Sequence, residues 1–262
     1  MTLRNEYRKS MSEAQGERFW RLYGLSTPDD LVLEDIAFQR GVLVIEQPLE
    51  KMEARLIRNA ERGLIRVKPD IAEMGRKRFA IAHELGHWEL HKDVSQLFAC
   101  TSDDMVAPYR ISPQEGEANC FAAGLLMPSH LFTPNVMESV LSFETLTQAA
   151  KYFRTSRTAT AIRYVELSGD YCAVVVAEAG KIRWWRGTES FEQHFWLERG
   201  ASLSRNSLAA SLFMEGQGHA GPDEVDIDAW SERGSGLDSE TFIEESLYMR
   251  TYSQTMTLLR LP

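Results

Sequence analysis

The sequence predicts a mixed α+β fold, and three of its patterns support that prediction. Residues 76–91 lack proline and repeat apolar side chains at helical spacing, which is typical of an amphipathic helix. Residues 112–128 begin with Ser-Pro and end at a proline, as helices often do. Residues 171–177 form a continuous apolar run between turn-like segments, which indicates a buried strand. Helical and strand patterns in separate stretches are typical of the α+β class.

The elements before residue 70 are predicted as a helix, a strand and a hairpin. Pro28-Asp29-Asp30 begins a helix that extends to Gln39, and residues 41–45 read as a strand. Residues 54–58 and 64–67 alternate about a turn-like stretch, which predicts a β-hairpin. An edge strand of this kind can hold an extended peptide by strand addition.

The segment Ala82-His83-Glu84-Leu85-Gly86-His87 places two histidines four residues apart on the predicted helix at 76–91. One helical turn separates them, so both imidazoles lie on one face and can bind the same zinc ion. Counting about 100° per residue, that face points away from the apolar stripe, which can anchor the helix in a core. Glu84 lies beside the metal, where a carboxylate can act as a general base toward water.

A third metal ligand is expected from the helix at 112–128. Glu115 and Asn119 are four residues apart, so the carboxylate can reach the metal while the amide supports a ligating histidine. Two alternatives stay open. Glu115 can instead complete a capping box with Ser112, or Glu117 can be the ligand from a face about 200° away.

These motifs resemble those of the ImmA/IrrE metallopeptidases of bacteria and phages: HELGH with Trp88-Glu89-Leu90-His91 after it, then ExEAN, FAA and LLMP up to Pro128. The resemblance implies a gluzincin-like, zincin-fold domain that holds Zn²⁺ through two histidines and a glutamate, with a second glutamate as general base: His83, His87, Glu115 and Glu84. It further implies an endopeptidase that cleaves a helix-turn-helix repressor of the XRE type and so derepresses stress, DNA-damage or defence genes. DNA, single-stranded DNA included, is a candidate activator.

Further side chains are candidates for roles around the metal. Cys100 lies in a Ser-, Asp- and Thr-rich loop between the two predicted helices, where its thiolate could fill a fourth zinc position and hold the enzyme idle. A small buried thiol without that role is the alternative. The oxyanion of the reaction needs a positive or hydrogen-bonding group, and the candidates are His91, Tyr109 and Arg110. The backbone of His91 lies about 6 Å beyond that of His87 along the helix, which favours a supporting role.

Residues 143–163 predict two short helices joined at Thr155-Ser156, an arrangement that resembles a helix-turn-helix. Its basic side chains could contact nucleic acid or a partner repressor: Lys151, Arg154, Arg157 and Arg163. The alternative is a packing unit that scaffolds the peptidase domain.

The sequence changes from helical to strand-like patterns near residue 169, which indicates a second domain. Strands are predicted at 171–177, 181–185 and 256–261, and residues 216–223 read as a Gly/Pro loop. We interpret this part as a smaller α+β sensing domain, GAF-like or similar. The expected organisation is therefore a zincin-like metallopeptidase domain, a helix-turn-helix-like segment and a regulatory domain, at residues 1–140, 141–168 and 169–262.

Composition favours a cytoplasmic protein with no membrane association. The chain has 262 residues, 44% of them hydrophobic, and a formal net charge of -9. Three cysteines are too few and odd in number for a secreted disulfide framework. No apolar run approaches the about 18 residues of a membrane span, and the acidic balance argues against a protein that coats DNA by bulk charge.

Two functions are compatible with these patterns. The first is a zinc-dependent endopeptidase that cleaves a DNA-binding repressor. The second is a non-proteolytic DNA-binding regulator in which zinc is structural. Glu84 favours the first, since a structural site has no use for a carboxylate base beside the metal.

Overall fold

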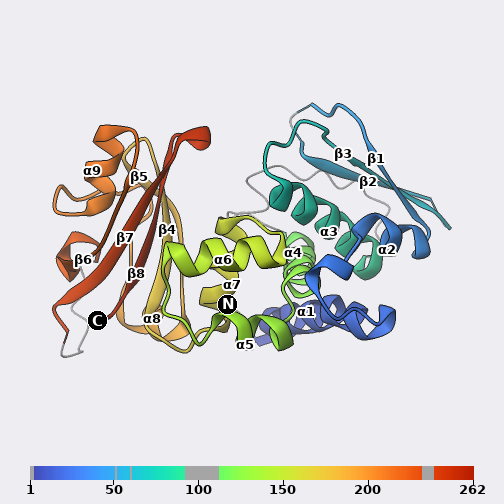
Figure 1. Ribbon diagram of the computed structural model, residues 1–262, viewed down its shortest axis with the longest axis horizontal. Coiled ribbons are helices and arrows are strands. Elements are labelled where there is room, and N and C mark those ends of the chain that lie inside the picture. The colour runs from blue at the N-terminus through green and yellow to red at the C-terminus, as the bar shows by residue number, and fades with distance from the viewer. Residues whose placement is uncertain (1–2, 51, 60, 92–111, 232–238) are drawn as a thin grey trace. The chain divides into compact units, whose positions relative to one another are not determined.

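The computed structural model describes residues 3–50, 52–59, 61–91, 112–231 and 239–262 (Figure 1). The chain divides into two compact units, the first made of Met1–Asn135 with Gln148–Thr160 and the second of Val136–Thr147 with Ala161–Pro262. Each unit contains helices and one sheet, so the predicted α+β class is confirmed. Within the described ranges, every helix is too short or too polar to cross a membrane.

The sheet of the first unit has three strands in the order β1-β3-β2. The predicted hairpin is its antiparallel pair, β2 (Ala54–Arg58) and β3 (Gly63–Val67), and β1 (Val42–Glu46) lies parallel to β3. Helix α3 (Met74–Leu90), which carries the HExxH motif, contacts β2 and β3 (Figure 1). The short helices η1 (Pro28–Asp30) and α2 (Leu33–Gln39) precede β1.

Helices α4 (Pro113–Leu126) and α1 (Leu3–Tyr23) complete the support of α3. Helix α4 packs against α3 on one side and against α1 on another, and α5 (Ser129–Val136) follows. The indole N–H of Trp20 on α1 donates to the carbonyl oxygen of Leu125 at 2.8 Å. The long first helix therefore fixes the position of α4, which the sequence patterns did not reveal.

Gly16 marks the closest approach of α1 to α4. A Cβ atom at this position would lie 2.2 Å from the carbonyl oxygen of Phe121 and 2.8 Å from the backbone nitrogen of Leu125. We expect Gly16→Ala to lower the free energy of unfolding by about 1–3 kcal/mol, because two backbones would have to separate. Denaturant titration measures the loss. Gly116→Ala is the matched control, since among the described residues a Cβ there meets only the Lys9 side chain, at 3.6 Å; equal stability of the two variants would contradict the prediction.

The second unit is built on a five-stranded antiparallel sheet in the order β5-β4-β8-β7-β6. Its strands are β4 (Cys172–Glu178), β5 (Lys181–Gly187), β6 (His219–Asp226), β7 (Thr241–Met249) and β8 (Gln254–Arg260). Helices α8 (Glu189–His194) and α9 (Leu208–Glu215) contact the sheet, and an aromatic core forms around Trp185, Phe191, Phe195 and Phe242. The short helices η2 (Ile227–Ala229) and η3 (Arg250–Tyr252) flank β7.

The prediction of a loop at residues 216–223 is wrong, because strand β6 begins at His219. Its pairing with β7 shifts register between Ala220 and Asp223, so Pro222 lies in the irregular part of an edge strand. A proline has no N–H to give to a ladder, and a bulge on an edge strand is where that loss is tolerated. Helices α6 (Phe143–Phe153) and α7 (Arg157–Leu167) match the predicted helix pair, and each has residues in both units.

A carboxylate lies in the aromatic core of the second unit. Glu244 on β7 is fully buried and accepts hydrogen bonds from the indole of Trp230, the backbone N–H of Ala209 and the hydroxyl of Ser246, at 2.8, 2.8 and 2.9 Å. Burial raises the pKa of Glu244 above its usual value of 4.5, although these donors act to lower it.

The raised pKa of Glu244 predicts a pH-dependent stability. The folded protein retains a proton that the unfolded chain releases, so the stabilising contribution is fully present below pH 4.5 and is lost as the pH rises through the folded-state pKa. We expect Glu244→Gln to remove this component, so the advantage of the wild type over the variant shrinks with rising pH. Urea denaturation at a series of pH values measures it, with the exposed Glu240→Gln as control. Parallel pH profiles of wild type and Glu244→Gln would refute the assignment.

Candidate metal centre

The HExxH histidines lie on a helix that is enclosed on several sides. Helix α3 packs against the three-stranded sheet and α4, and its His83 and His87 are fully buried. Gly86, between them in sequence, allows α4 to approach, because a Cβ there would lie 3.1 Å from Phe121 and 3.2 Å from the backbone of Ala118. The spacing of the motif thus serves two purposes: the histidines share one face, and a small residue leaves room for the second helix.

Three side chains converge on one point and form what we term the metal triad: His83, His87 and Glu115. The Nε2 atoms of the two histidines are 2.9 Å apart, and the Glu115 carboxylate lies 2.9 Å from His83 Nε2 and 3.3 Å from His87 Nε2. One donor atom from each residue fits within 4.8 Å of the others. Two imidazole nitrogens and one carboxylate oxygen form a ligand set of catalytic zinc sites, so the residues present fit the predicted Zn²⁺.

Glu115 reaches the triad from the first turn of α4. Its backbone N–H donates to the hydroxyl of the N-cap Ser112 at 3.3 Å, while its carboxylate contacts the histidines. Asn119, one turn later, accepts a hydrogen bond from Nδ1 of His83 through Oδ1 at 2.8 Å. An amide oxygen can only accept, so His83 carries its hydrogen on Nδ1 and presents Nε2 to the triad.

The electrostatics of the triad favour a neutral His87 and an ionised Glu115, the states in which these two side chains bind a cation. Burial lowers the pKa of His87 to about 4, so its imidazole is neutral near pH 7. Burial acts to raise the pKa of Glu115, but its close contacts with His83 and His87 lower it below its usual range. Burial also opposes the charged form of His83, yet the hydrogen bond to Glu115 and the nearby Glu84 raise its pKa.

Glu84 follows the first triad histidine on α3 and is fully buried. Its negative charge acts on His83, which places the carboxylate in the electrostatic field of the triad. A buried carboxylate beside a cation site is the group that a general base requires.

A second set of contacts extends from the other triad histidine. Nδ1 of His87 lies 3.0 Å from Nδ1 of His91, and Nε2 of His91 lies 3.0 Å from Oε2 of Glu117. Arg8 on α1 contacts the other oxygen of Glu117 at 3.4 Å. Glu117, which the sequence left open as a metal ligand, is thus paired with His91, and both ring nitrogens of His91 are engaged.

The end of α3 is held by a side chain whose role the sequence did not indicate. Arg58 on β2 donates to the carbonyl oxygen of His91 at 2.6 Å and to that of Trp88, and its guanidinium lies 4.4 Å from the centre of the Trp88 ring. Burial lowers the pKa of Arg58. A cation at the last carbonyls of a helix complements its dipole.

The remaining candidates divide into two groups. Cys100, Tyr109 and Arg110 lie outside the described residues. Of the basic side chains on the helix pair, Lys151, Arg154 and Arg157 are exposed, and Arg154 lies 3.8 Å from Asp29. Arg163 is only 1% exposed, so the prediction that it contacts a phosphate or a partner is wrong: its side chain belongs to the packed interior.

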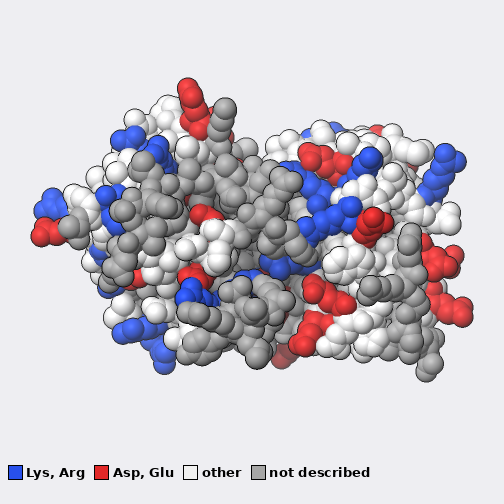
Figure 2. Space-filling view, turned by 180° about the vertical axis from the view of Figure 1, so that it is seen from behind, with Lys and Arg blue, Asp and Glu red and all other residues white. Residues whose placement is uncertain are grey.

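The turn of the helix pair is itself packed against α3. Thr155 is buried and donates a hydrogen bond to the sulfur of Met127, and a Cβ atom on Gly75 would lie 2.1 Å from the backbone of Thr155. These contacts favour the scaffolding interpretation of this segment over a free DNA-binding element. On the face seen in Figure 2, acidic and basic side chains are interspersed over the described residues.

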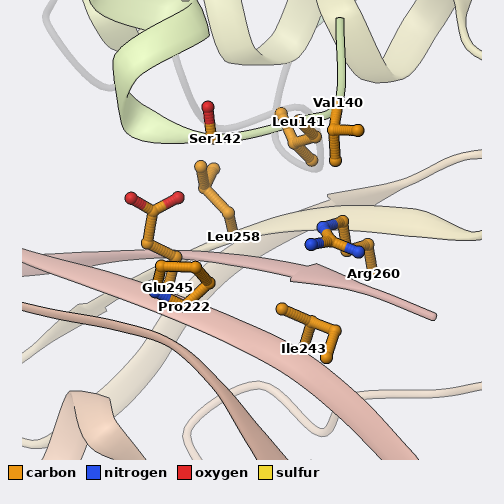
Figure 3. A pocket seen from close by; sticks show the side chains of 8 residues that line it. All are labelled: Val140, Leu141, Ser142, Pro222, Ile243, Glu245, Leu258 and Arg260. Carbon is orange, nitrogen blue, oxygen red and sulfur yellow. The ribbon is translucent and has the colours of Figure 1, made fainter. Parts of the chain in front are cut away.

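The second unit contains a small cavity on the face of its sheet opposite Glu244 (Figure 3). It is lined by alternate residues of β7 and β8 and by the segment at 140–142: Val140, Leu141, Ser142, Ile243, Glu245, Leu258 and Arg260, with Pro222. Its volume of about 170 Å³ is below the about 300–1,000 Å³ of typical small-molecule sites. Glu245 is already bound to the backbone N–H of Phe143 and to His219, at 2.9 and 2.8 Å. The cavity is therefore too small for a typical ligand, and its carboxylate is already engaged.

The fold and the donor set define a metallopeptidase-type domain, and the comparisons with known proteins agree. Residues 37–164 match the IrrE N-terminal-like domain of the Peptidase_M78 family. The resemblance inferred from the motifs is thereby confirmed. A solved structure described as a Mycobacterium tuberculosis transcriptional regulator is similar over 95% of this chain and 86% of its own, with a TM-score of 0.60 and 15% identity, which shows a shared fold. No curated protein matches the sequence.

Proposed function

We propose that the chain is a zinc-dependent endopeptidase that cleaves a helix-turn-helix transcriptional repressor. The observation that carries the chemistry is the convergence of His83, His87 and Glu115 beside the buried Glu84. The class of substrate rests on the family of residues 37–164 and on the likeness to a protein described as a transcriptional regulator. A stress signal that derepresses defence or DNA-damage genes would act through this cleavage.

The roles of the residues follow from their contacts. Zinc bound by three protein ligands would supply an open position for water and lower the pKa of that water to about 7. The Glu84 carboxylate would accept a proton from the attacking water and deliver it to the leaving amine. Asn119 would keep Nε2 of His83 directed at the metal. The groups that stabilise the oxyanion, with Tyr109 and Arg110 as candidates, and a regulatory Cys100 remain predictions.

Co-expression with a candidate helix-turn-helix repressor from the same genome tests the proposal. The wild-type chain and the Glu84→Gln variant are each produced with that repressor, and the repressor is followed by immunoblot and by sequencing of new N-termini. We expect fragments only with the wild type. An intact repressor in both cultures, with or without DNA damage or added DNA, would favour the alternative of a non-proteolytic DNA-binding regulator with structural zinc.

A further inference from the structure

We infer that His91 and Glu117 form a positioning pair that fixes the tautomer and ring orientation of the metal ligand His87. The inference rests on the proposed zinc site and assigns its second histidine a support of its own. His87 Nδ1 contacts His91 Nδ1 at 3.0 Å, and His91 Nε2 contacts Glu117 Oε2 at 3.0 Å. The metal triad is composed of other residues, so this pair acts on the metal through His87.

The polarity of the chain of hydrogen bonds follows from what each atom can do. An ionised carboxylate only accepts hydrogen bonds, so the hydrogen between Glu117 and His91 belongs to Nε2 of His91. Nδ1 of a neutral His91 is then an acceptor, and the hydrogen between the two imidazoles belongs to Nδ1 of His87. His87 is left with a lone pair on Nε2, the atom that lies 2.9 Å from Nε2 of His83 in the triad. Glu117 therefore selects the metal-binding tautomer of His87 through His91.

Burial strengthens each contact of this pair. His91 is 6% exposed and the side chain of Glu117 is 14% exposed, so solvent screens their interaction weakly. Arg58 holds the backbone of His91 by donating to its carbonyl oxygen at 2.6 Å. Arg8 contacts Glu117 at 3.4 Å but is itself 49% exposed, so it adds an outer and weaker contact. The ring of His91 is thus fixed at its backbone and at both nitrogens.

The two triad histidines are supported differently, although both supports come from one short part of α4. Asn119 holds His83 directly with a neutral amide. Glu117 holds His87 indirectly, with a carboxylate that acts through a second imidazole. A carboxylate behind a ligating histidine raises the basicity of the ligand, and loss of such a partner typically costs about 10- to 100-fold in metal affinity.

Zinc affinity of the purified full chain tests the inference without relying on turnover. Competition with a chromogenic chelator gives the zinc Kd of the wild type, His91→Leu, His91→Gln and Glu117→Gln. We expect His91→Leu to weaken binding by about 10- to 100-fold, and His91→Gln to weaken it less, because its amide oxygen can still accept from His87 Nδ1. His194→Gln is the matched control, since that histidine hydrogen-bonds to the backbone of Ser190 on its own helix.

A double variant shows whether Glu117 and His91 act in series on His87 or independently of each other. If Glu117 acts through His91, adding Glu117→Gln to His91→Leu should weaken zinc binding no further. Long-range ¹H–¹⁵N spectra of the zinc-loaded protein should show the hydrogen of His87 on Nδ1. Unchanged zinc Kd in His91→Leu and Glu117→Gln would overturn the inference, as would additive losses. A wild type that binds no zinc would instead refute the proposed metal site. If His91→Leu does not fold, Glu117→Gln, which preserves side-chain size, carries the test.

Discussion

Glu84→Gln is expected to lower the kcat for repressor cleavage by about 100- to 10,000-fold, the usual contribution of a general base. Gln has the size of Glu, so the packing of this fully buried position is kept. What is lost is the capacity of the carboxylate to accept a proton. We expect the metal triad to survive, because Glu84 is not one of its three donors. The variant should bind zinc and fold like the wild type while it cleaves far more slowly.

Three measurements distinguish the loss of the proton acceptor from a loss of zinc or of the fold. Metal analysis gives the zinc content, thermal unfolding reports the integrity of the fold, and steady-state cleavage of the repressor gives kcat and KM. Glu89→Gln is the control on the same helix, because that carboxylate is bound to Arg40 at 2.7 and 2.8 Å and is not a member of the triad. Wild-type kcat in zinc-loaded Glu84→Gln would show that the proton acceptor is another group.

The sequence predicted the parts of the site that depend on helical spacing. His83 and His87 are one turn apart, as are Glu115 and Asn119, and the structure brings these two pairs together. Both pairings depend only on positions within a helix and on caps that are visible in the sequence. The contact between the two helices belongs to the tertiary structure, which periodicity does not predict. The expectation that they meet came from the family motifs.

Contacts between distant elements were beyond the reach of the sequence patterns. The pairing of His91 with Glu117 joins residues 26 positions apart, and the bond from Arg58 to the end of α3 joins residues 33 apart. Nothing in local composition says that an arginine on a strand will end a helix rather than face solvent. Arg163 shows the converse: a basic residue beside a turn indicates a surface contact, yet this side chain is buried. Strand β6 was missed because glycine and proline are usual in loops.

Glu115→Gln is expected to weaken zinc binding by more than about 100-fold, beyond the usual cost of losing an indirect support. The reason is charge. Burial keeps the imidazole of His87 neutral by lowering its pKa to about 4. His83 must likewise be neutral to bind a metal, so neither histidine brings a negative charge. Glu115 is therefore the negative ligand in the triad, and a divalent cation in a buried, low-dielectric site needs an anion nearby.

The matched control for Glu115→Gln is Glu34→Gln, which removes a carboxylate from the first turn of another helix, α2. Both variants therefore lose a favourable interaction between a negative side chain and the helix dipole. The amide that Glu115→Gln introduces can still offer an oxygen, so a surviving weak site would measure the electrostatic part of the affinity. Removing the oxygen as well, by Glu115→Ala, should abolish binding in the same chelator competition. Wild-type affinity in Glu115→Ala would place the third ligand elsewhere, because no rearrangement of α4 lets an alanine side chain coordinate a metal.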